Sequence, residues 1–335
     1  MPEGHPWNVE LTGLDYPTWR SRLETVGEAL GFFEPLGSKH HALFHEEGDT
    51  LLVSFESFAG IGALSESCRP LGLEVAETNG WSLLSVVSKN DTWFRAEEVY
   101  AFFDQLTDDG FFDDFDRVLF YGAGPCGYAA AAYSVAAPGA VVVALQPQAT
   151  LDPRVTEWDE RFTEQRRMTF TDRYGYAPDM IEGAERGHVI YDSREPLDAM
   201  HAALFHRPNV MRHRVPFLGT TLQAALIEME VLDEILTAAA EGDLTRLSFA
   251  RFLRARRDYG PYLRRLLARL EMDQRLELVR ILCEFVTARK TAPRFRRRLR
   301  ALRRIEGESG EGEDPEGSGP GAPAGPGDPE VAAAR

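Results

Sequence analysis

The stretch of the chain that most constrains its fold runs from Phe115 to Ser134 and reads FDRVLFYGAGPCGYAAAAYS. Its apolar run, Val118 to Tyr121, is typical of a buried strand, and the alanine-rich segment after Gly127 is typical of a helix. Between them stands Gly-Ala-Gly-Pro-Cys-Gly, whose small residues permit a tight turn. The stretch therefore predicts a strand, a turn and a helix, as found where helices cover a mostly parallel sheet.

The rest of residues 1–221 repeats this alternation. Apolar or β-branched runs recur at 50–57, 82–88, 117–122, 140–147, 188–193 and 210–219, and helical patterns fall at 96–106 and 127–136. Strands that alternate with helices predict an α/β domain with a mostly parallel sheet. The run KHHALFHEEGD (39–49) predicts a further strand with polar flanks. Its histidine spacing matches neither H-E-x-x-H nor a zinc-finger pair, so we expect no metal site there.

The remainder of the chain reads differently. Residues 222–305 place Leu, Ile, Val and Met at three- and four-residue spacings, which predicts an all-helical appendage. Residues 306–335 are rich in Gly, Pro and Glu with almost nothing to bury, which predicts a disordered tail. Three parts are thus expected: an α/β domain, a helical appendage and a tail.

The formal net charge of −16 is unevenly distributed. The tail holds eight acidic residues against one basic residue, a contribution of −7, whereas residues 289–304 hold nine Lys and Arg in sixteen positions. An acidic chain is a poor general binder of nucleic acid, because phosphates require clustered positive charge. We interpret the basic stretch as a solvated helix face that could dock a protein, and we expect no nucleic-acid partner.

Composition also bounds the location of the protein. No apolar run reaches about 18 residues, so no membrane span or membrane partner is expected, and MPEGHPWNVELTG does not resemble a secretory signal peptide. The three cysteines, Cys68, Cys126 and Cys283, are widely spaced and odd in number, which does not indicate a disulfide framework. We therefore expect a cytoplasmic protein.

Two kinds of site are built on a strand, a glycine turn and a helix. The spacing of Gly122, Gly124 and Gly127 matches the fingerprint that brings a helix N-terminus up to a dinucleotide pyrophosphate. That fingerprint normally opens the fold and needs an acidic residue about 20 positions later for the ribose. Here two strands precede the turn, and the next strand ends in Leu145-Gln146-Pro147-Gln148. The order of elements therefore favours the second kind of site, a nucleophile elbow with the pattern G-x-S-x-G.

The segment from Gly122 to Tyr128 resembles the elbow of the α/β-hydrolase superfamily, in particular bacterial members with Gly-Ser-Ser-Met-Gly-Gly-Tyr. Residues 141–162 also resemble the segment after the elbow in those proteins, and the resemblance covers about residues 50–235. It implies an α/β-hydrolase-like fold with the nucleophile at Gly124, the acid at Asp192 or Asp198, and the base at Thr220. Gly124 has no side chain and threonine is no base, so the resemblance implies a fold without its usual chemistry.

Other residues could substitute for the missing ones. Cys126 stands two positions past the missing serine, near a helix N-terminus that would stabilise a thiolate, although a small buried cysteine that packs under the turn accounts for it better. His201 follows Asp198 at a place where related proteins also carry a histidine, and we expect it to hydrogen-bond the adjacent loop.

The segment SKNDTWFR (88–95) follows the preceding strand, at the sheet edge where open α/β folds bind ligands. We therefore expect a ligand pocket at this edge, and we expect no cofactor. An anionic group of the ligand would lie near Arg95 and the start of the helix. The expected ligand-binding residues are Asn90, Trp93, Arg95, Gly122, Pro125 and Gly127.

Taken whole, with WSLLSVVSK, LTDDGFFDDFDRVLF, AAAAYSVAAPGA and LQPQATLDP, the chain is similar to bacterial proteins often labelled phosphoadenosine phosphosulfate reductase. That label implies a sulfonucleotide substrate and a catalytic cysteine. The Ser-Gly-Gly-x-Asp-Ser loop and the Glu-Cys-Gly-Leu-His motif of such reductases do not occur here, and Cys283 stands in ILCEFV on the apolar side of a predicted helix.

These patterns leave three hypotheses. The chain is a non-catalytic α/β-hydrolase-like protein that binds a small ligand or a protein partner, or an unusual hydrolase or transferase that uses Cys126. The third is a nucleotide-dependent oxidoreductase such as the labelled reductase.

Overall fold

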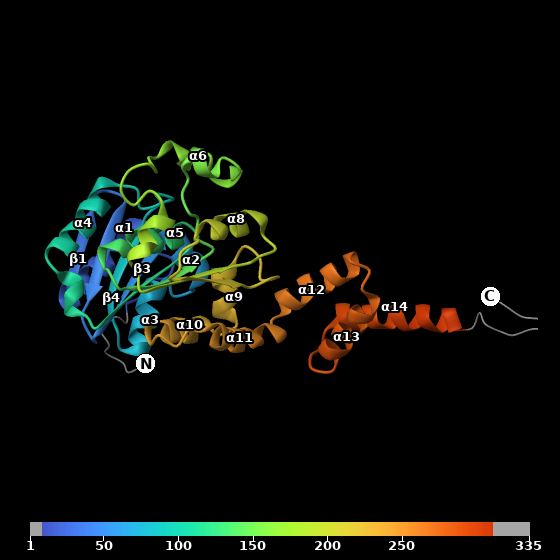
Figure 1. Cartoon of the computed structure of the whole chain (residues 1–335). Helices are drawn as coiled ribbons and strands as arrows, with labels where there is room; N and C mark the ends of the chain where they lie inside the picture. The colour runs from blue at the N-terminus through green and yellow to red at the C-terminus, as the bar shows by residue number, and fades with distance from the viewer. Residues whose placement is uncertain (1–8, 311–335) are drawn as a thin grey trace, which may run out of the picture. The chain divides into compact units, whose positions relative to one another are not determined.

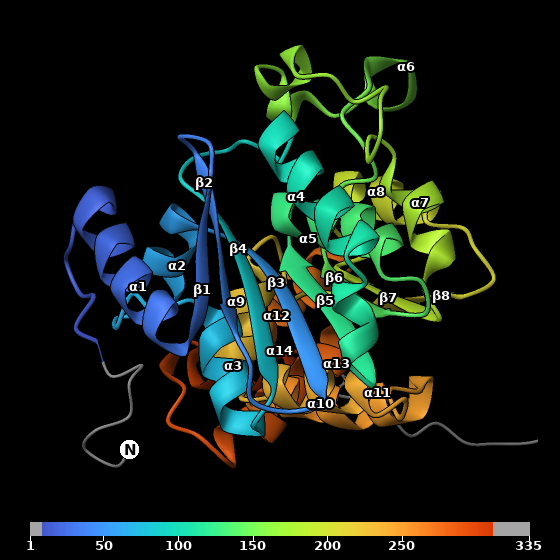
Figure 2. The same cartoon turned by 90° about the vertical axis from the view of Figure 1, so that its left-hand side faces the viewer.

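The computed structural model describes residues 9–310, and residues 9–265 form one mostly parallel eight-stranded sheet with helices on both faces (Figures 1 and 2). The strands are β1 (Gly31–Leu36), β2 (His40–His45), β3 (Thr50–Ser57), β4 (Ser82–Ser88), β5 (Arg117–Ala123), β6 (Val141–Leu145), β7 (Arg186–Tyr191) and β8 (Val210–Arg214). Their spatial order is β1-β2-β4-β3-β5-β6-β7-β8. Only β2 runs antiparallel to its neighbours, β1 and β4.

The α-helices mostly fall between the strands. They are α1 (Tyr16–Leu30), α2 (Phe58–Leu64), α3 (Leu71–Asn79), α4 (Glu97–Asp108), α5 (Pro125–Tyr133), α6 (Pro153–Thr156), α7 (Ala177–Met180), α8 (Pro196–Leu204), α9 (Leu222–Glu228), α10 (Leu232–Ala240), α11 (Arg246–Phe252), α12 (Gly260–Met272), α13 (Leu276–Thr287) and α14 (Pro293–Gly310). Short 3₁₀ turns are η1 (Phe111–Asp114), η2 (Ser134–Ala136), η3 (Glu160–Phe162), η4 (Gln165–Arg167), η5 (Ile181–Gly183) and η6 (Leu253–Arg257). No helix in the described range is both long and apolar enough to cross a bilayer.

The two faces of the sheet bury separate hydrophobic cores. On one face, α4, α5 and α7 pack on the central strands, and the four alanines 129–132 of α5 are fully buried there. Their small side chains let the helix approach the sheet closely. The other face is covered by α1, α3, α9, α10 and α11, with Trp19 and Leu23 of α1 among its buried residues. Because both faces are covered, strands such as β4 are buried along their whole length.

The α/β class expected from the sequence is observed: the sheet is mostly parallel with helices on both faces, and a C-terminal helical region follows it. The six strands expected from 50 onwards are all present, within a few residues of their expected bounds, and 40–45 is a strand as well. The pattern did not reveal β1, an edge strand with Pro35 and Glu34 in it. Proline is tolerated at sheet edges because its missing N–H needs no partner there.

The chain divides into two units, Met1–Arg265 and Leu266–Arg335. The sequence places the boundary at 221, but α10 contacts β5 and β6 and buries Ile235 and Leu236 in the second core. These helices therefore belong with the sheet. Within the second unit, α13 packs against α14. Residues 306–310, expected to be disordered, continue α14, since no proline interrupts the chain before 315. The rest of the expected tail, 311–335, lies outside the described residues.

Candidate ligand pocket

The turn between β5 and α5, which we call the elbow, joins a strand to a helix as the sequence predicts. Gly124 stands at its apex with φ +57° and ψ −124°, a conformation that strains any residue with a side chain. A Cβ atom built on Gly124 would meet no other atom within 4 Å, so space for a side chain exists. The elbow is formed, but no nucleophilic atom stands on it.

The flanking glycines allow the turn to close. A Cβ atom on Gly122 would lie 2.2 Å from the carbonyl oxygen of Cys126, and one on Gly127 would lie 3.0 Å from the carbonyl oxygen of Leu145. Both glycines are buried against backbone. Their role in the structure is close packing of strand, turn and helix, and neither borders the pocket described below.

Pro125 leaves the turn without a backbone N–H donor next to Gly124. In α/β-hydrolases one donor of the oxyanion hole is the backbone N–H of the residue that follows the nucleophile. That residue is Pro125 here, the first residue of α5, and proline has no N–H. The elbow therefore lacks both the attacking atom and one of the donors that stabilise a tetrahedral intermediate.

Asp192, at the expected acid position, follows β7 and is fully buried. Its carboxylate accepts hydrogen bonds from two backbone groups, the N–H of Arg194 at 2.8 Å and the N–H of Gly219 at 2.6 Å. Gly219 immediately precedes the expected base position, Thr220, which is exposed. The acid thus holds the backbone of the loop on which a catalytic histidine would stand.

Gln146, at the end of β6, braces the same loop. Its side-chain amide donates to the carbonyl oxygen of Gly219 at 3.2 Å and accepts from the N–H of Leu222 at 3.0 Å. Arg265 donates to the carbonyl oxygen of Leu218 at 2.7 Å. Because these bonds satisfy the backbone on both sides of Thr220, the loop is fixed without a histidine.

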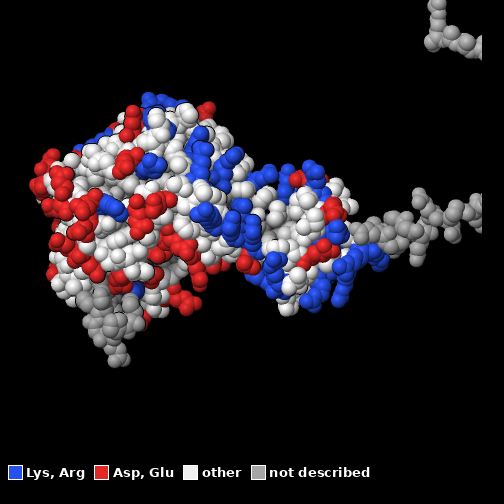
Figure 3. Space-filling view, turned by 60° about the horizontal axis from the view of Figure 1, so that its bottom comes forward, with Lys and Arg blue, Asp and Glu red and all other residues white. Residues whose placement is uncertain are grey.

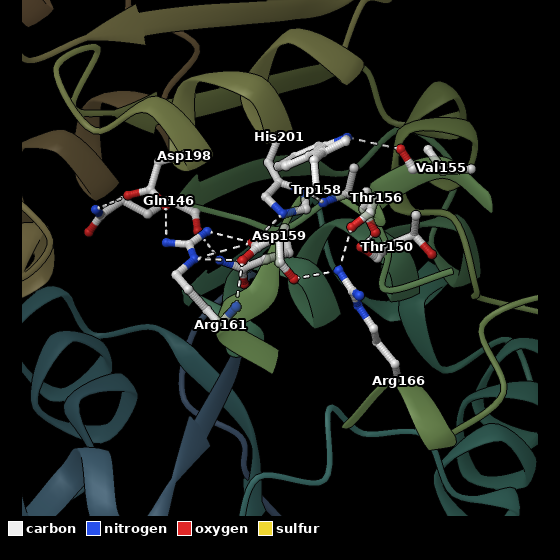
Figure 4. Close-up of polar contacts among 12 residues, drawn as sticks. Gln146, Thr150, Val155, Thr156, Trp158, Asp159, Arg161, Arg166, Asp198 and His201 are labelled. Atoms are coloured by element: carbon white, nitrogen blue, oxygen red, sulfur yellow. Dashed lines mark hydrogen bonds and ion pairs between the residues drawn. The ribbon is translucent and has the colours of Figure 1, made fainter. Parts of the chain in front are cut away.

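Gln146 also begins a buried polar network that Figure 4 shows. Its amide donates to Asp198 at 2.7 Å, and Arg161 bridges Asp198 and Asp159. Asp159 in turn lies 2.9 Å from Nε2 of His201, whose Nδ1 accepts from the backbone N–H of Ala149 at 3.1 Å. Burial alone would raise the pKa of Asp159, but its hydrogen bonds from His201 and Arg161 lower that pKa well below its usual range.

This network settles the places of Asp198 and His201. Both are buried, and both tie the segment after β6 to α8. His201 hydrogen-bonds the adjacent loop, as expected from the sequence, and neither residue lines the pocket beside the elbow.

A cavity of about 130 Å³ opens at the carboxyl ends of β3, β4 and β5, beside the elbow. We call it the elbow pocket. Its walls come from β3 and α2, the loop after β4, the elbow and α9, and they are Phe55, Glu56, Ser57, Gly60, Ile61, Leu64, Ser88, Asn90, Asp91, Thr92, Trp93, Phe94, Ala123, Pro125, Cys126 and Gln223. Three of the expected ligand-binding residues, Asn90, Trp93 and Pro125, therefore meet at one cavity.

The loop that forms one wall of the elbow pocket is strained. Trp93 and Phe94 both have positive φ, +55° and +57°, which non-glycine residues rarely adopt. The indole N–H of Trp93 is buried and has no hydrogen-bond partner among the described residues. Strained backbone and unsatisfied donors concentrate at binding sites, where they are retained because they serve function.

The charged groups of the elbow pocket are acidic. Glu56 is buried and accepts hydrogen bonds from the N–H groups of Leu71 and Gly72, at 2.8 and 2.9 Å, and from the Ser54 hydroxyl at 3.2 Å. Burial raises the pKa of Glu56 to about 7 despite these bonds. The second acid, Asp91, is exposed. No Lys or Arg of the described residues lines the cavity.

Arg95 does not reach this cavity. Its side chain is 1% exposed and turned toward the segment 169–173, where it pairs with Asp172 and donates to the carbonyl oxygens of Thr169 and Arg173. It also lies over the ring of Tyr100. With the guanidinium fully engaged there, the pocket lacks the cation on which the expectation of an anion near Arg95 depended.

Cys126 lines the elbow pocket and is partly buried, so its side chain is not hidden behind the turn. Burial raises the pKa of its thiol well above the usual range, and the negative charges of Glu56 and Asp91 act in the same direction. A thiolate at this position is therefore disfavoured, in contrast to catalytic cysteines, which lie in electropositive surroundings.

The histidines of the 39–49 segment make packing and hydrogen-bond contacts within the sheet domain. Nε2 of His40 lies 2.6 Å from the hydroxyl of Thr92, and the ring of His41 stacks on Phe33. Burial lowers the pKa of His40 to about 4. Among residues 9–310 no three His, Cys, Asp or Glu side chains are grouped so as to hold a metal ion.

A larger cavity of about 660 Å³ lies at the opposite end of the strands from the elbow pocket, against the amino ends of β5, β6 and β7. Ligands of open α/β folds bind at the carboxyl ends of the strands. The elbow pocket is therefore the stronger candidate in spite of its size.

Comparisons with known proteins find similarity in structure alone. No protein-family model and no curated protein sequence matches the chain. Among solved structures, an esterase of Pyrobaculum calidifontis is 15% identical with a TM-score of 0.43, covering 70% of this chain and 95% of its own. The capsule O-acetyltransferase of Neisseria meningitidis serogroup A is 12% identical with a TM-score of 0.39, covering 60% and 92%. Carboxyl esterase 2 of Tuber melanosporum is 12% identical with a TM-score of 0.39, covering 60% and 82%. Similarities this distant assign no activity to the chain.

Sequence reasoning overlooked two parts of the site. The absence of a backbone N–H at Pro125 is readable from the sequence, since proline never has one. Glu56 gave no such signal, because a lone glutamate at the end of an apolar run is usually exposed. Only the packing of α3 against the end of β3 shows that it is buried.

Proposed function

We propose that the chain is a non-catalytic α/β-hydrolase-like protein that binds a small ligand in the elbow pocket. The observation that carries the proposal is the pair Gly124 and Pro125, which occupies an elbow of the right backbone shape with neither a nucleophile nor the adjacent N–H donor. Thr220 at the base position supports it further.

The reductions in kcat that follow the loss of single catalytic groups argue against residual triad chemistry. In serine proteases, removal of the nucleophile lowers kcat by about 10⁶-fold, and removal of one oxyanion donor lowers it by roughly 10²- to 10³-fold. These effects are not additive, and without the triad a serine protease keeps only about 10³- to 10⁴-fold of acceleration over the uncatalysed rate, which comes from the oxyanion hole and substrate binding. This chain lacks both groups and the base as well.

The lining of the elbow pocket supports a neutral or cationic ligand. Its charged groups are Glu56 and Asp91, its polar groups include the side chains of Asn90 and Gln223, and Trp93 supplies an aromatic wall. A volume of about 130 Å³ accommodates only a few non-hydrogen atoms, whereas pockets for drug-sized molecules span roughly 300 to 1,000 Å³. The ligand is therefore small, or enters with one end only.

Binding is tested with a matched pair of variants. Ala123→Leu adds three carbon atoms to the wall of the elbow pocket, and Ala63→Leu makes the same change on the exposed side of α2. We expect ethanolamine and acetamide to bind the unmodified chain and Ala63→Leu in saturation-transfer NMR, and not to bind Ala123→Leu. Acetate should fail to bind all three proteins. Equal binding to both variants, or no binding of any probe, would rule out a small-ligand site here.

Catalysis is tested in parallel with 4-nitrophenyl acetate and acetyl-CoA. Turnover at the background rate supports the proposal. Because Cys126 lines the elbow pocket, hydrolysis or acyl transfer through its thiol is the second candidate function. It requires turnover that Cys126→Ala abolishes and that Cys68→Ala, a change at a cysteine outside the pocket, leaves intact. Such a result would overturn the non-catalytic proposal.

A further inference from the structure

The charge of the chain is divided unequally between its two units. Residues 1–265 hold 41 Asp and Glu against 24 Lys and Arg, whereas residues 266–304 hold four Asp and Glu against twelve Lys and Arg. In Figure 3, Lys and Arg gather on the surface next to the grey C-terminal residues, and Asp and Glu gather over other parts. The net charge of −16 therefore conceals a strongly basic segment.

Most of this basic segment is α14, which packs on α13 through one side. Phe295, Leu299 and Leu302 follow one another at spacings of four and three residues, and all three are buried. Helical periodicity places a second set of residues on the side turned away from these three. The set consists of Arg296, Arg297, Arg300 and Arg304, all exposed, and we call it the arginine face.

The other arginines of α14 show what distinguishes the arginine face. Arg298 and Arg303 lie on the flanks of the helix, and their side chains lie 2.8 Å from Glu271 and 3.9 Å from Glu284. Flanking arginines thus serve contacts with the neighbouring helices α12 and α13. The arginine face instead presents four guanidinium groups to solvent along about 12 Å of helix.

The make-up of the arginine face favours nucleic acid over protein as its partner. Between Arg296 and Arg304 the large apolar side chains, Leu299 and Leu302, are both buried, so the exposed side offers charge without apolar contact area. The core of a protein–protein interface is apolar and rich in aromatic residues. Attraction between arginine and phosphate, in contrast, supplies essentially all of the non-specific affinity for nucleic acid.

The same features indicate which nucleic acid fits. Sites for single strands stack bases on aromatic side chains, whereas the aromatic residue of α14, Phe295, is buried. The major groove of an RNA duplex is too deep and narrow for side chains to read. The major groove of DNA, about 12 Å wide, admits an α-helix and has phosphates along both of its edges.

The acidic first unit does not cancel this attraction. Charges separated by more than about 8–10 Å of solvent are largely screened at physiological ionic strength. The local charge of α14 therefore matters more for a contact at its surface than the net charge of the chain, from which we expected no nucleic-acid partner.

We propose that the arginine face of α14 binds double-stranded DNA through contacts with its phosphates. The site lies in the second unit, and failure of the function proposed for the elbow pocket would leave it unaffected.

Fluorescence anisotropy of a labelled DNA duplex, titrated with the full chain at several KCl concentrations, tests the proposal. The triple change Arg296→Gln, Arg297→Gln and Arg300→Gln should weaken binding at least about tenfold at 0.1 M KCl. Each phosphate contact contributes about −0.9 to the slope of log K against log[KCl]. The triple variant should therefore have a slope shallower by about 2.7.

Two matched proteins control for total charge and for folding. The triple change Arg167→Gln, Arg212→Gln and Arg251→Gln removes the same charge at exposed positions outside α14, and its affinity should stay within about twofold. Lysine in place of glutamine at 296, 297 and 300 keeps the charge and should restore most of the affinity. Circular dichroism checks that every variant is folded.

The contrary results are equally specific. Absence of duplex binding at 0.05 M KCl overturns the proposal. An equal loss in the control variant, or an unchanged salt slope in the α14 variant, also overturns it, since either would indicate attraction that does not depend on the arginine face. Tighter binding of single-stranded DNA, of polyglutamate or of phosphatidylserine vesicles than of the duplex would likewise overturn it, and would assign the face to a partner of that class.

Discussion

The carboxylate of Asp192 accepts a hydrogen bond from the backbone N–H of Gly219 at 2.6 Å. In a working hydrolase the acid orients a histidine, and here the same group orients the loop that would carry that histidine. Gln146 and Arg265 are bonded to the same loop, so these side chains together with Asp192 form a brace. The carboxylate of Asp192 therefore has a structural role here.

This brace predicts the effect of Asp192→Asn. An amide oxygen replaces one carboxylate oxygen and an NH₂ group faces the other backbone donor, so one buried N–H loses its acceptor. We expect the free energy of unfolding to fall by about 1–3 kcal/mol, measured by urea denaturation. Asp243→Asn, at an exposed position, is the control and should change it by less than about 0.5 kcal/mol. A neutral result at Asp192 would contradict the brace.

The elbow predicts a cost for any side chain at its apex. Gly124→Ser has space for its hydroxyl but must adopt φ near +57°, which costs of order 1–3 kcal/mol. We expect lower stability and no gain of esterase activity, because Pro125 and Thr220 are unchanged. Gly62→Ala, exposed on α2 with no atom within 4 Å of the new Cβ, should be neutral or slightly stabilising. Esterase activity in Gly124→Ser would show that the other losses do not matter.

The buried carboxyl group of Glu56 should make the free energy of unfolding depend on pH. Burial raises its pKa to about 7 in the folded chain, from an ordinary value of 4.5. Between these values the folded chain binds more protons than the unfolded chain, so the free energy of unfolding falls as the pH rises through that window. Glu56→Gln removes this contribution.

Buried histidines titrate in the opposite direction over part of the same range, since burial lowers the pKa of His41, His188 and His213. The difference between the two proteins is therefore the quantity to measure. Glu56→Gln should be more stable relative to the unmodified chain at pH 8 than at pH 5, by urea denaturation at each pH. A difference that is independent of pH would place the pKa of Glu56 near its ordinary value.

We expect the thiol of Cys126 to be alkylated slowly. Because burial and nearby carboxylates raise the pKa of its thiol, iodoacetamide at pH 7.5 should modify it far more slowly in the folded chain than in guanidinium chloride, as followed by peptide mass spectrometry. A rate in the folded protein above that of the unfolded chain would indicate a reactive thiolate and would favour the second candidate function.

The sequence predicted most of the sheet, because buried strands such as Ser82–Ser88 and Val141–Leu145 are continuous apolar runs between turn residues. It did not predict β1, whose Pro35 and Glu34 are permitted only because the strand lies at an edge. Nor did it predict that α9 to α11 cover the sheet. The sequence pattern of an amphipathic helix indicates that one face is buried, but it does not indicate which element that face packs against.

At the candidate site, the sequence located the turn at Gly124 and the place of Asp192, since both follow clear strands. The prediction that the positive charge of Arg95 borders the pocket was wrong. Arg95 follows β4 closely, but its long side chain is drawn to Asp172, which is 77 positions away in the sequence. The acid that does line the elbow pocket, Glu56, is buried through contact with the start of α3. Both outcomes depend on contacts between distant segments, which local patterns do not encode.

The proline at position 125 has a consequence for how such a protein could change over generations. A single substitution can place a serine at the elbow, but that serine would find no base and no amide beside it to stabilise a reaction. Hydrolysis at this turn would require several changes at once, each without benefit alone. If the proposed function holds, a ligand carrying an ester would therefore leave the elbow pocket intact.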